Sequence, residues 1–419
     1  GERIMETYTI LKNVAIILLV AKAFGILARK CKAPQVVGEI IAGLIIGPCV
    51  LGLVQQTEFL SAMAEIGVVI IMFSAGLETD LRDLMKTGFF AFLIACAGVL
   101  VPLVGGALLY FAFYGASPWG SEGFMRAVFM GTIMTATSVS ITVQALREMG
   151  HLKGRVGTTI MSAAIIDDVI GIVVLTFVIG MKSSEVQPVQ VLLRTALFFV
   201  FAIIGGVVIY KIMKKYDAHH PHTRRIPILG LAFCLAMAYA AERYFGIADI
   251  TGAYVAGIIM CNIHDSDYIA EKMDINSYMI FGPLFFASIG IKVVLPAMNG
   301  KVVGFTVVLV IVAVLTKVLG CGLGAKVCGY KNYQCARIGV GMISRGEVAL
   351  IVADKGSALG LMGSSFLGPV VIVVVITTII TPILLKFVFR FGPKGASGTG
   401  ALASNYEQIE KYREGEMDK

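Results

Sequence analysis

The sequence predicts an all-α, polytopic membrane protein with about thirteen transmembrane helices, and three observations support this fold class. Hydrophobic residues make up 57% of the 419 residues and charged residues only 15%, whereas soluble proteins carry about 25% charged residues. Apolar runs of the roughly 20 residues needed to cross a bilayer recur along the chain. Lysine and arginine gather in alternate connections between these runs.

The candidate spans follow one another with short polar connections. They cover approximately residues 8–28, 34–53, 59–77, 87–114, 122–146, 155–181, 189–213, 226–245, 247–263, 277–296, 302–328, 335–354 and 364–391. Basic residues are frequent after odd-numbered spans and absent from connections such as 55–58 and 115–122. Since cytoplasmic loops are enriched in Lys and Arg, we expect the N-terminus outside and the C-terminus in the cytoplasm. The net charge of +8 then reflects membrane topology, and no nucleic-acid partner is expected.

Two pairs of similar segments share one sequence offset. GEIIAGLII (38–46) resembles GAYVAGIIM (252–260), and FSAGLETDL (73–81) resembles ASIGIKVVL (287–295), both at 214 residues (252 − 38 and 287 − 73). The related spans are seven apart in order, an odd number, so the copies have opposite orientation in the membrane. Inverted repeats are typical of secondary transporters that bind substrate near the midplane. Small-residue apolar helices also resemble one another by chance.

The run 157–181 is long and apolar enough to cross a bilayer, yet Asp167 and Asp168 lie at its middle. Carboxylates at this depth are costly and by default mark an ion or proton pathway. Neighbouring residues on a helix point about 100° apart, so the two side chains cannot share one face. We expect one carboxylate to face a cavity and the other to face a neighbouring helix.

Polar residues interrupt two further spans. Segment 131–143, GTIMTATSVSITV, places Thr137 and Ser138 among several hydroxyls at membrane depth. ISRGEVAL interrupts the twelfth span with Arg345 and Glu347. Hydroxyls satisfy backbone groups freed by a helix break and supply oxygen ligands to hard cations, although Ser and Thr also hold helices together in lipid. Two interrupted helices at matching places in two halves point to a transporter binding site.

Three further charges have expected partners or positions. Lys317 is the one charge in the middle of its span, too deep to reach either interface, so we expect it to pair with a buried carboxylate. Glu78 lies near the end of the third span and is expected to be a helix-end charge. Arg345 and Glu347 are expected to form a structural or gating pair with each other or with Glu78.

Nothing in the sequence indicates a cofactor or an enzyme. Residues 392–419 are predicted to be a short cytoplasmic tail, and its GASGTG is a weak nucleotide signature because no strand precedes it. The eight cysteines are scattered without a CxxC pair, so neither a zinc site nor a disulfide framework is indicated.

At TATSVSITV, IIDDVIGI and LTKVLG, the chain resembles bacterial sodium/proton antiporters of the cation/proton antiporter superfamily, in the aspartate-pair branch. The resemblance covers about residues 8–391 and implies that the fifth and twelfth spans are crossed, half-unwound helices. It also implies that Asp168 binds the cation, sodium, that Asp167 pairs with Lys317, and that exchange is electrogenic. The potassium-efflux branch is similar too, but its large C-terminal nucleotide-binding domain has no counterpart in this sequence.

The resemblance further implies a domain organisation within a transmembrane antiporter of residues 1–391. The core domain would contain the helices around 59–181 and 277–354, and a dimerisation domain the remaining helices, about 8–53, 189–263 and 364–391. The implied partners are sodium, protons, the lipid bilayer and a second copy of the chain. The implied location is the bacterial inner membrane.

A carboxylate in a wet cavity holds either a proton or a desolvated cation, so binding of one releases the other. With alternating access, this competition gives exchange of sodium, or of lithium, for protons. Potassium/proton exchange is the alternative, and an organic-anion symporter, which needs a larger and less acidic cavity, is more remote. An intramembrane aspartyl protease needs two carboxylates facing one water, and a cation channel needs a filter-like loop. The sequence favours neither.

Overall fold

The structure is a computed structural model that describes residues 2–31, 33–79, 81–152, 154–180, 188–219, 223–293, 300–358, 360–362 and 366–391. The described residues form α- and π-helices and contain no strand, which confirms the all-α fold class. The expected tail, 392–419, lies outside the described residues.

Sixteen α-helices and two π-helical turns follow one another along the described chain. The first half contains α1 (Glu2–Lys30), α2 (Gln35–Ile46), α3 (Glu58–Leu77), α4 (Leu81–Tyr114), α5 (Glu122–Thr135), α6 (Val139–Glu148), α7 (Arg155–Gly180) and α8 (Pro188–His219). The second half contains α9 (Arg225–Ala240), η1 (Ala241–Phe245), α10 (Asp249–Met260), α11 (Ser266–Asn276), η2 (Ser277–Phe281), α12 (Gly282–Ile291), α13 (Gly300–Val327), α14 (Asn332–Gly341), α15 (Glu347–Ala358) and α16 (Leu367–Phe389).

The chain is a multi-pass membrane protein by the length and composition of its helices. Ten helical segments of the described residues are long and apolar enough to cross a membrane, and α2 and α10 are shorter apolar helices. The count of thirteen spans stays a prediction, because the interrupted span 335–354 is divided between the short helices α14 and α15.

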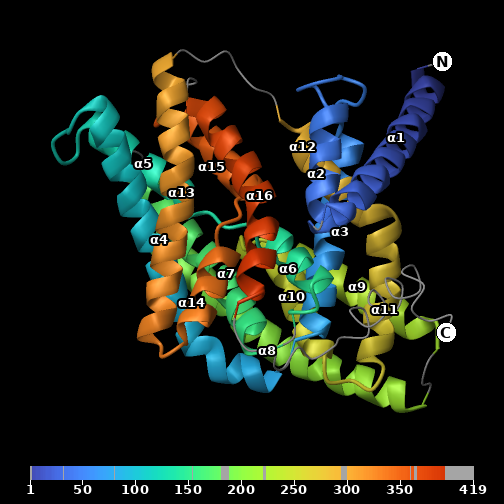
Figure 1. The fold of residues 1–419 in the computed structure, drawn as a ribbon. Helices are drawn as coiled ribbons and strands as arrows, with labels where there is room; N and C mark the ends of the chain where they lie inside the picture. Colours follow the sequence, from blue (N-terminus) through green and yellow to red (C-terminus); the bar gives the residue numbers. More distant parts are fainter. Residues whose placement is uncertain are drawn as a thin grey trace.

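The helices pack in two groups, which Figure 1 shows side by side. In the first, α4 packs against α5, α7 and α13, and α16 packs against α13 and α14. In the second, α3 packs against α10 and α12, and α2 packs against α1 and α12. We call the first, α4–α7 with α13–α16, the site group, and the second, α1–α3 with α8–α12, the scaffold group.

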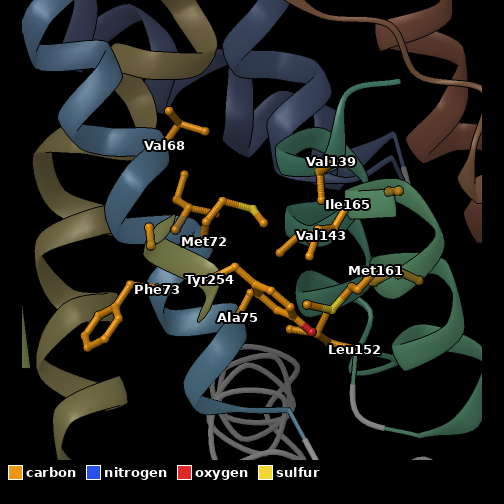
Figure 2. Close-up of a cluster of buried hydrophobic side chains, with 14 of the residues drawn as sticks. Val68, Met72, Phe73, Ala75, Val139, Val143, Leu152, Met161, Ile165 and Tyr254 are labelled. Carbon is orange, nitrogen blue, oxygen red and sulfur yellow. The ribbon is translucent and has the colours of Figure 1, made fainter. Parts of the chain in front are cut away.

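The two groups meet across an apolar surface. Figure 2 shows side chains from α3 and α10 of the scaffold group lying against side chains from α6 and α7 of the site group. Met72, Val143, Met161 and Tyr254 are all buried members of this one hydrophobic cluster. Because both faces are apolar, burial of hydrocarbon stabilises this contact without fixing it through directional bonds.

Close helix contacts repeat at the sequence offset of the internal repeat. A Cβ on Gly257 would collide with the backbone of Phe73 and Gly76, and a Cβ on Gly43 would collide with the backbone of Ala287. Gly43 and Gly257 are repeat equivalents, as are Gly76 and Gly290 (257 − 43 and 290 − 76, both 214). The α2–α12 and α3–α10 contacts are therefore equivalent, which supports the duplication.

We expect Gly257→Ala to lower the stability of the protein, because the added methyl group must push α3 away from α10. Overpacking of this kind costs about 1–3 kcal/mol. Gly205→Ala is the matched control, since a Cβ on that helical glycine meets nothing within 4 Å. Thermal unfolding in detergent measures both variants, and equal melting temperatures for the two would contradict the close α3–α10 contact.

Candidate functional site

Two helices stop in the middle of the site group and cross each other through their extended segments. The first break lies between Thr135, the last residue of α5, and Val139, the first of α6. The second lies between Gly341, which ends α14, and Glu347, which begins α15. This is the pair of crossed, partly unwound helices that the family resemblance implies for the fifth and twelfth spans.

The two breaks satisfy each other's backbone groups. The Ser138 N–H donates to the Ser344 carbonyl at 2.7 Å, and the Ser344 hydroxyl donates to the Ser138 carbonyl at 2.8 Å. The Thr142 hydroxyl donates to the Gly341 carbonyl at 2.8 Å. Unpaired backbone groups at membrane depth cost several kcal/mol each, so these reciprocal bonds make the break tolerable. Ser138 thus serves the crossing through its backbone groups, and a role of its hydroxyl in ion binding stays a prediction.

Arg345 binds carbonyl oxygens at the same crossing. Its side chain is fully buried. Its guanidinium donates to the carbonyls of Met134 at 2.8 Å, Ile343 at 2.8 Å and Ala313 at 3.0 Å. Helix C-termini carry partial negative charge on carbonyls that lack a helical partner, and Met134 lies in the last turn of α5. The cation therefore stabilises the end of a broken helix.

The described contacts of Arg345 are with carbonyl oxygens, and its expected pairing with Glu347 stays a prediction. Glu78, at the end of α3 as expected, lies 3.5 Å from the Arg147 Nε atom instead. Glu347 is the first residue of α15, and its side chain lies outside the described part of the structure. Sequence reasoning missed the Arg345 contacts because backbone carbonyls leave no residue-type signal.

The structure brings Asp167, Lys317 and Thr137 together. The Lys317 Nζ atom lies 3.0 Å from both carboxylate oxygens of Asp167, and the Thr137 hydroxyl donates to Oδ2 at 2.7 Å. Asp167 is 1% exposed and Lys317 is fully buried. Gly98 of α4 faces this pair, and a Cβ there would come 3.8 Å from Nζ. One buried acid is thus compensated by one buried cation and one hydroxyl.

Asp168 points into a cavity of about 140 Å³. Its Oδ1 atom is buried and has no hydrogen-bond partner among the described residues. The lining residues come from α5 and the break after it, from α7, from α15 and from the connection before α10: Thr132, Thr135, Ala136, Asp167, Asp168, Gly171, Ile172, Leu175, Ala248, Val348 and Val352. A water molecule occupies about 30 Å³ in the liquid, so the cavity has room for a partly hydrated ion.

Thr132 and Thr135 bring hydroxyl oxygens to the same cavity. Their protons are donated to the carbonyls of Val128 at 2.9 Å and Thr132 at 2.8 Å, so the oxygen lone pairs remain free to accept or to coordinate. The sequence identified these hydroxyls only as part of a polar run. Which of them face Asp168 depends on the angle at which α5 meets α7, which the local pattern does not encode.

A polar contact joins the two groups at the end of α6. The Glu148 carboxylate accepts from the Gln35 N–H, at the start of α2, at 2.6 Å. Arg147, 5% exposed, lies beside Glu78 of α3 and donates to the Ile71 carbonyl at 3.5 Å. We call Gln35, Glu78, Arg147 and Glu148 the α6 clasp.

We expect the Asp167–Lys317 pair to show strong energetic coupling. Removing one partner leaves a buried charge uncompensated, which costs about 3–5 kcal/mol. Lys317→Ala should therefore melt at a lower temperature, and Asp167→Asn in the same chain should recover part of the loss. Lys326→Ala, at an exposed lysine on the same helix, is the control. Strictly additive losses in the double-mutant cycle would show that the two groups do not interact.

The sequence is similar to those of known transport proteins. The family model described as sodium/hydrogen exchanger, transmembrane, matches residues 15–391. The chain is 37% identical over 378 residues to the Na(+)/H(+)-K(+) antiporter GerN of Bacillus cereus, covering 90% of this chain and 95% of that protein. It is 33% identical over 378 residues to a Na(+)/H(+) antiporter of Enterococcus hirae, covering 88% of this chain and 96% of that one.

The fold is also similar to a solved structure. The sodium proton antiporter MjNhaP1 of Methanocaldococcus jannaschii at pH 8 superimposes with a TM-score of 0.65 at 17% identity, covering 94% of this chain and 97% of that one. The family model and the relatives cover nearly the whole described membrane region, and the crossed breaks with their acidic cavity lie within it. The chain belongs to the transmembrane sodium/hydrogen exchanger family of the cation/proton antiporter superfamily, whose members are transporters rather than enzymes.

Proposed function

We propose that this protein exchanges sodium for protons across the membrane by alternating access. The observation that carries the proposal is the different surroundings of two neighbouring acids. Asp167 is compensated by Lys317 and Thr137, whereas Asp168 presents an oxygen without a described partner to a cavity. A cation and a proton compete for that carboxylate, so loading one releases the other.

The proposed roles follow from these contacts. Asp168 holds the transported sodium or proton, and the oxygens of Thr132 and Thr135 lie on the same cavity wall. Asp167, Lys317 and Thr137 form the second proton-accepting unit. Ser138 and Arg345 hold the crossing, and Glu78 and Glu347 are structural or gating charges. Oxygen donors suit a hard monovalent cation.

Potassium is the second candidate cation, because the name of the Bacillus cereus relative includes potassium beside sodium. An organic anion fits less well. The cavity carries carboxylates, and its volume of about 140 Å³ is small for an organic substrate.

Contacts between the two groups support alternating access. The Asp168 cavity extends along the second half of α7 toward Leu175, whereas the α6 clasp lies near the start of α7, at the opposite end. Glu148 and Arg147 therefore hold the two groups together at the end of α7 opposite to the Asp168 cavity. We propose that the clasp opens when Asp168 turns to that side.

The packing favours a division into domains that differs from the expected one in three helices. α3 and α12 pack with α2 and α10 in the scaffold group, although 59–77 and 277–296 were expected in the core. α16 packs with α13 and α14 in the site group, although 364–391 was expected with the dimerisation helices. We propose that the site group moves and that the scaffold group forms a homodimer.

We further propose that the protein resides in the bacterial cell membrane with the N-terminus outside and the C-terminus in the cytoplasm. The alternation of Lys and Arg between the connections supports this orientation. With this orientation, the Asp168 cavity lies on the outer side and the α6 clasp on the cytoplasmic side.

Asp168→Asn should reduce exchange to the level of protein-free vesicles, because an amide cannot trade a proton for a cation. The measurement is radioactive sodium uptake with an internal pH dye in proteoliposomes. Asp267→Asn makes the same chemical change at an exposed acid and should leave exchange intact. Sodium-dependent proton movement by folded Asp168→Asn protein would rule out the proposed role of this carboxylate.

We expect wild-type exchange to be electrogenic. If both acids change protonation in one cycle, two protons enter for each sodium that leaves, and one net charge crosses. An inside-negative potential then favours sodium extrusion by about 2.3 kcal/mol per 100 mV. Sodium-driven current on a solid-supported membrane, recorded beside isotope flux, measures this charge. Lys317→Gln should keep part of the flux with less current per ion, and wild-type flux without current would contradict the two-proton cycle.

A further inference from the structure

The wall of the Asp168 cavity is built almost wholly by one of the two groups. Of its lining residues, those from α5, α7 and α15 belong to the site group. Ala248, in the connection between η1 and α10, is the single contribution of the scaffold group among the described residues. Any movement of the site group against the scaffold therefore carries Asp168 past Ala248.

The backbone holds Ala248 in place from both sides. Before it, the π-helical turn η1 is followed by Gly246 with φ +68°, and the Ile247 N–H donates to the Ala241 carbonyl at 3.0 Å. After it, the Ala248 carbonyl accepts from the Thr251 N–H at 3.0 Å as α10 begins. Ile247 is buried and anchors the connection. The Ala248 methyl group is thus a fixed part of the cavity wall.

The neighbourhood of Ala248 also contains exposed charge. Carboxylate oxygens of Glu65, Glu242 and Asp249 lie within 4.8 Å of one another, with Glu65 and Glu242 exposed. Exposing such groups to hydrocarbon is costly, so this face of the protein meets water or headgroups. Asp249 directly follows Ala248 in the chain. Ala248 therefore lines the cavity of Asp168 and is followed in the chain by a residue of this acidic face.

We propose that the Ala248 side chain determines the width of the entrance through which the ion reaches Asp168. This proposal rests on the proposed exchange function. Its small side chain leaves the passage to Asp168 open, and the surrounding backbone cannot retreat to accommodate a larger one. A side chain several carbons longer at this position fills the cavity from the scaffold side and blocks cation entry. The chemistry of Asp168 itself is unchanged by such a substitution.

Substitutions of increasing size at Ala248 test whether the volume of this side chain limits ion entry. Ala248→Ser adds one oxygen and should keep exchange within about twofold of wild type, whereas Ala248→Phe should lower it by at least about tenfold, equivalent to roughly 1.4 kcal/mol of barrier. Thermal unfolding in detergent checks that both variants fold. Full exchange by folded Ala248→Phe protein would overturn the proposal.

Thiol labelling tests the same position without a bulky core substitution. Ala248→Cys should keep enough exchange to be measured and lose it when a charged methanethiosulfonate reagent is added to the water. Sodium should slow this labelling, since ion and reagent share the entrance. Tyr244→Cys, 66% exposed on η1 and not a lining residue, should be labelled without loss of exchange. Wild-type protein treated alike controls for the eight native cysteines.

The outcomes distinguish failure of the proposed exchange function from failure of the role proposed for Ala248. Wild-type protein without sodium-dependent proton movement would contradict the proposed function itself. Wild-type exchange together with an Ala248→Cys protein that resists labelling, or that keeps exchange after labelling verified by mass spectrometry, would overturn only the role of Ala248. Loss of exchange in both cysteine variants would also overturn it, because the effect would not be specific to the cavity wall.

Discussion

The requirement that backbone polar groups find partners at membrane depth is the constraint on which the site depends. α5 and α14 both stop inside the bundle, and the reciprocal bonds between Ser138 and Ser344 replace the helical bonds that each lacks. At the same crossing, the Met134 carbonyl accepts a hydrogen bond from Arg345. Because the chain is extended here, Thr137 can reach Asp167 while Thr135 and Ala136 form part of the cavity wall.

The adjacent aspartates have the same chemistry and different surroundings. Successive helical positions point in different directions, so Asp167 meets Lys317 of α13 and Asp168 meets the cavity. Pairing one acid leaves the site with a single uncompensated carboxylate.

Much of this arrangement could be predicted from the sequence, because it leaves local signals. The all-α class follows from hydropathy, the breaks from polar residues in apolar runs, and a carboxylate partner for Lys317 from the scarcity of charges at membrane depth. The family resemblance identifies that partner as Asp167. Other features have no local signal. Arg147 falls among the basic residues between two spans, yet it is 5% exposed because Glu78 of α3 lies beside it. Nothing in the sequence around Ala248 indicates that it lines the cavity.

The distribution of polar contacts explains how such a bundle can hold two arrangements. Backbone-to-backbone glycine contacts at Gly43 and Gly257 lock the scaffold group internally, and the crossing bonds lock the site group. Between the groups, the surface in Figure 2 is apolar, so sliding one face along the other exposes little that water must solvate. The α6 clasp is a polar contact at one end of this surface. In the proposed cycle, the site group turns on this apolar face while the α6 clasp breaks, and neither group has to unfold.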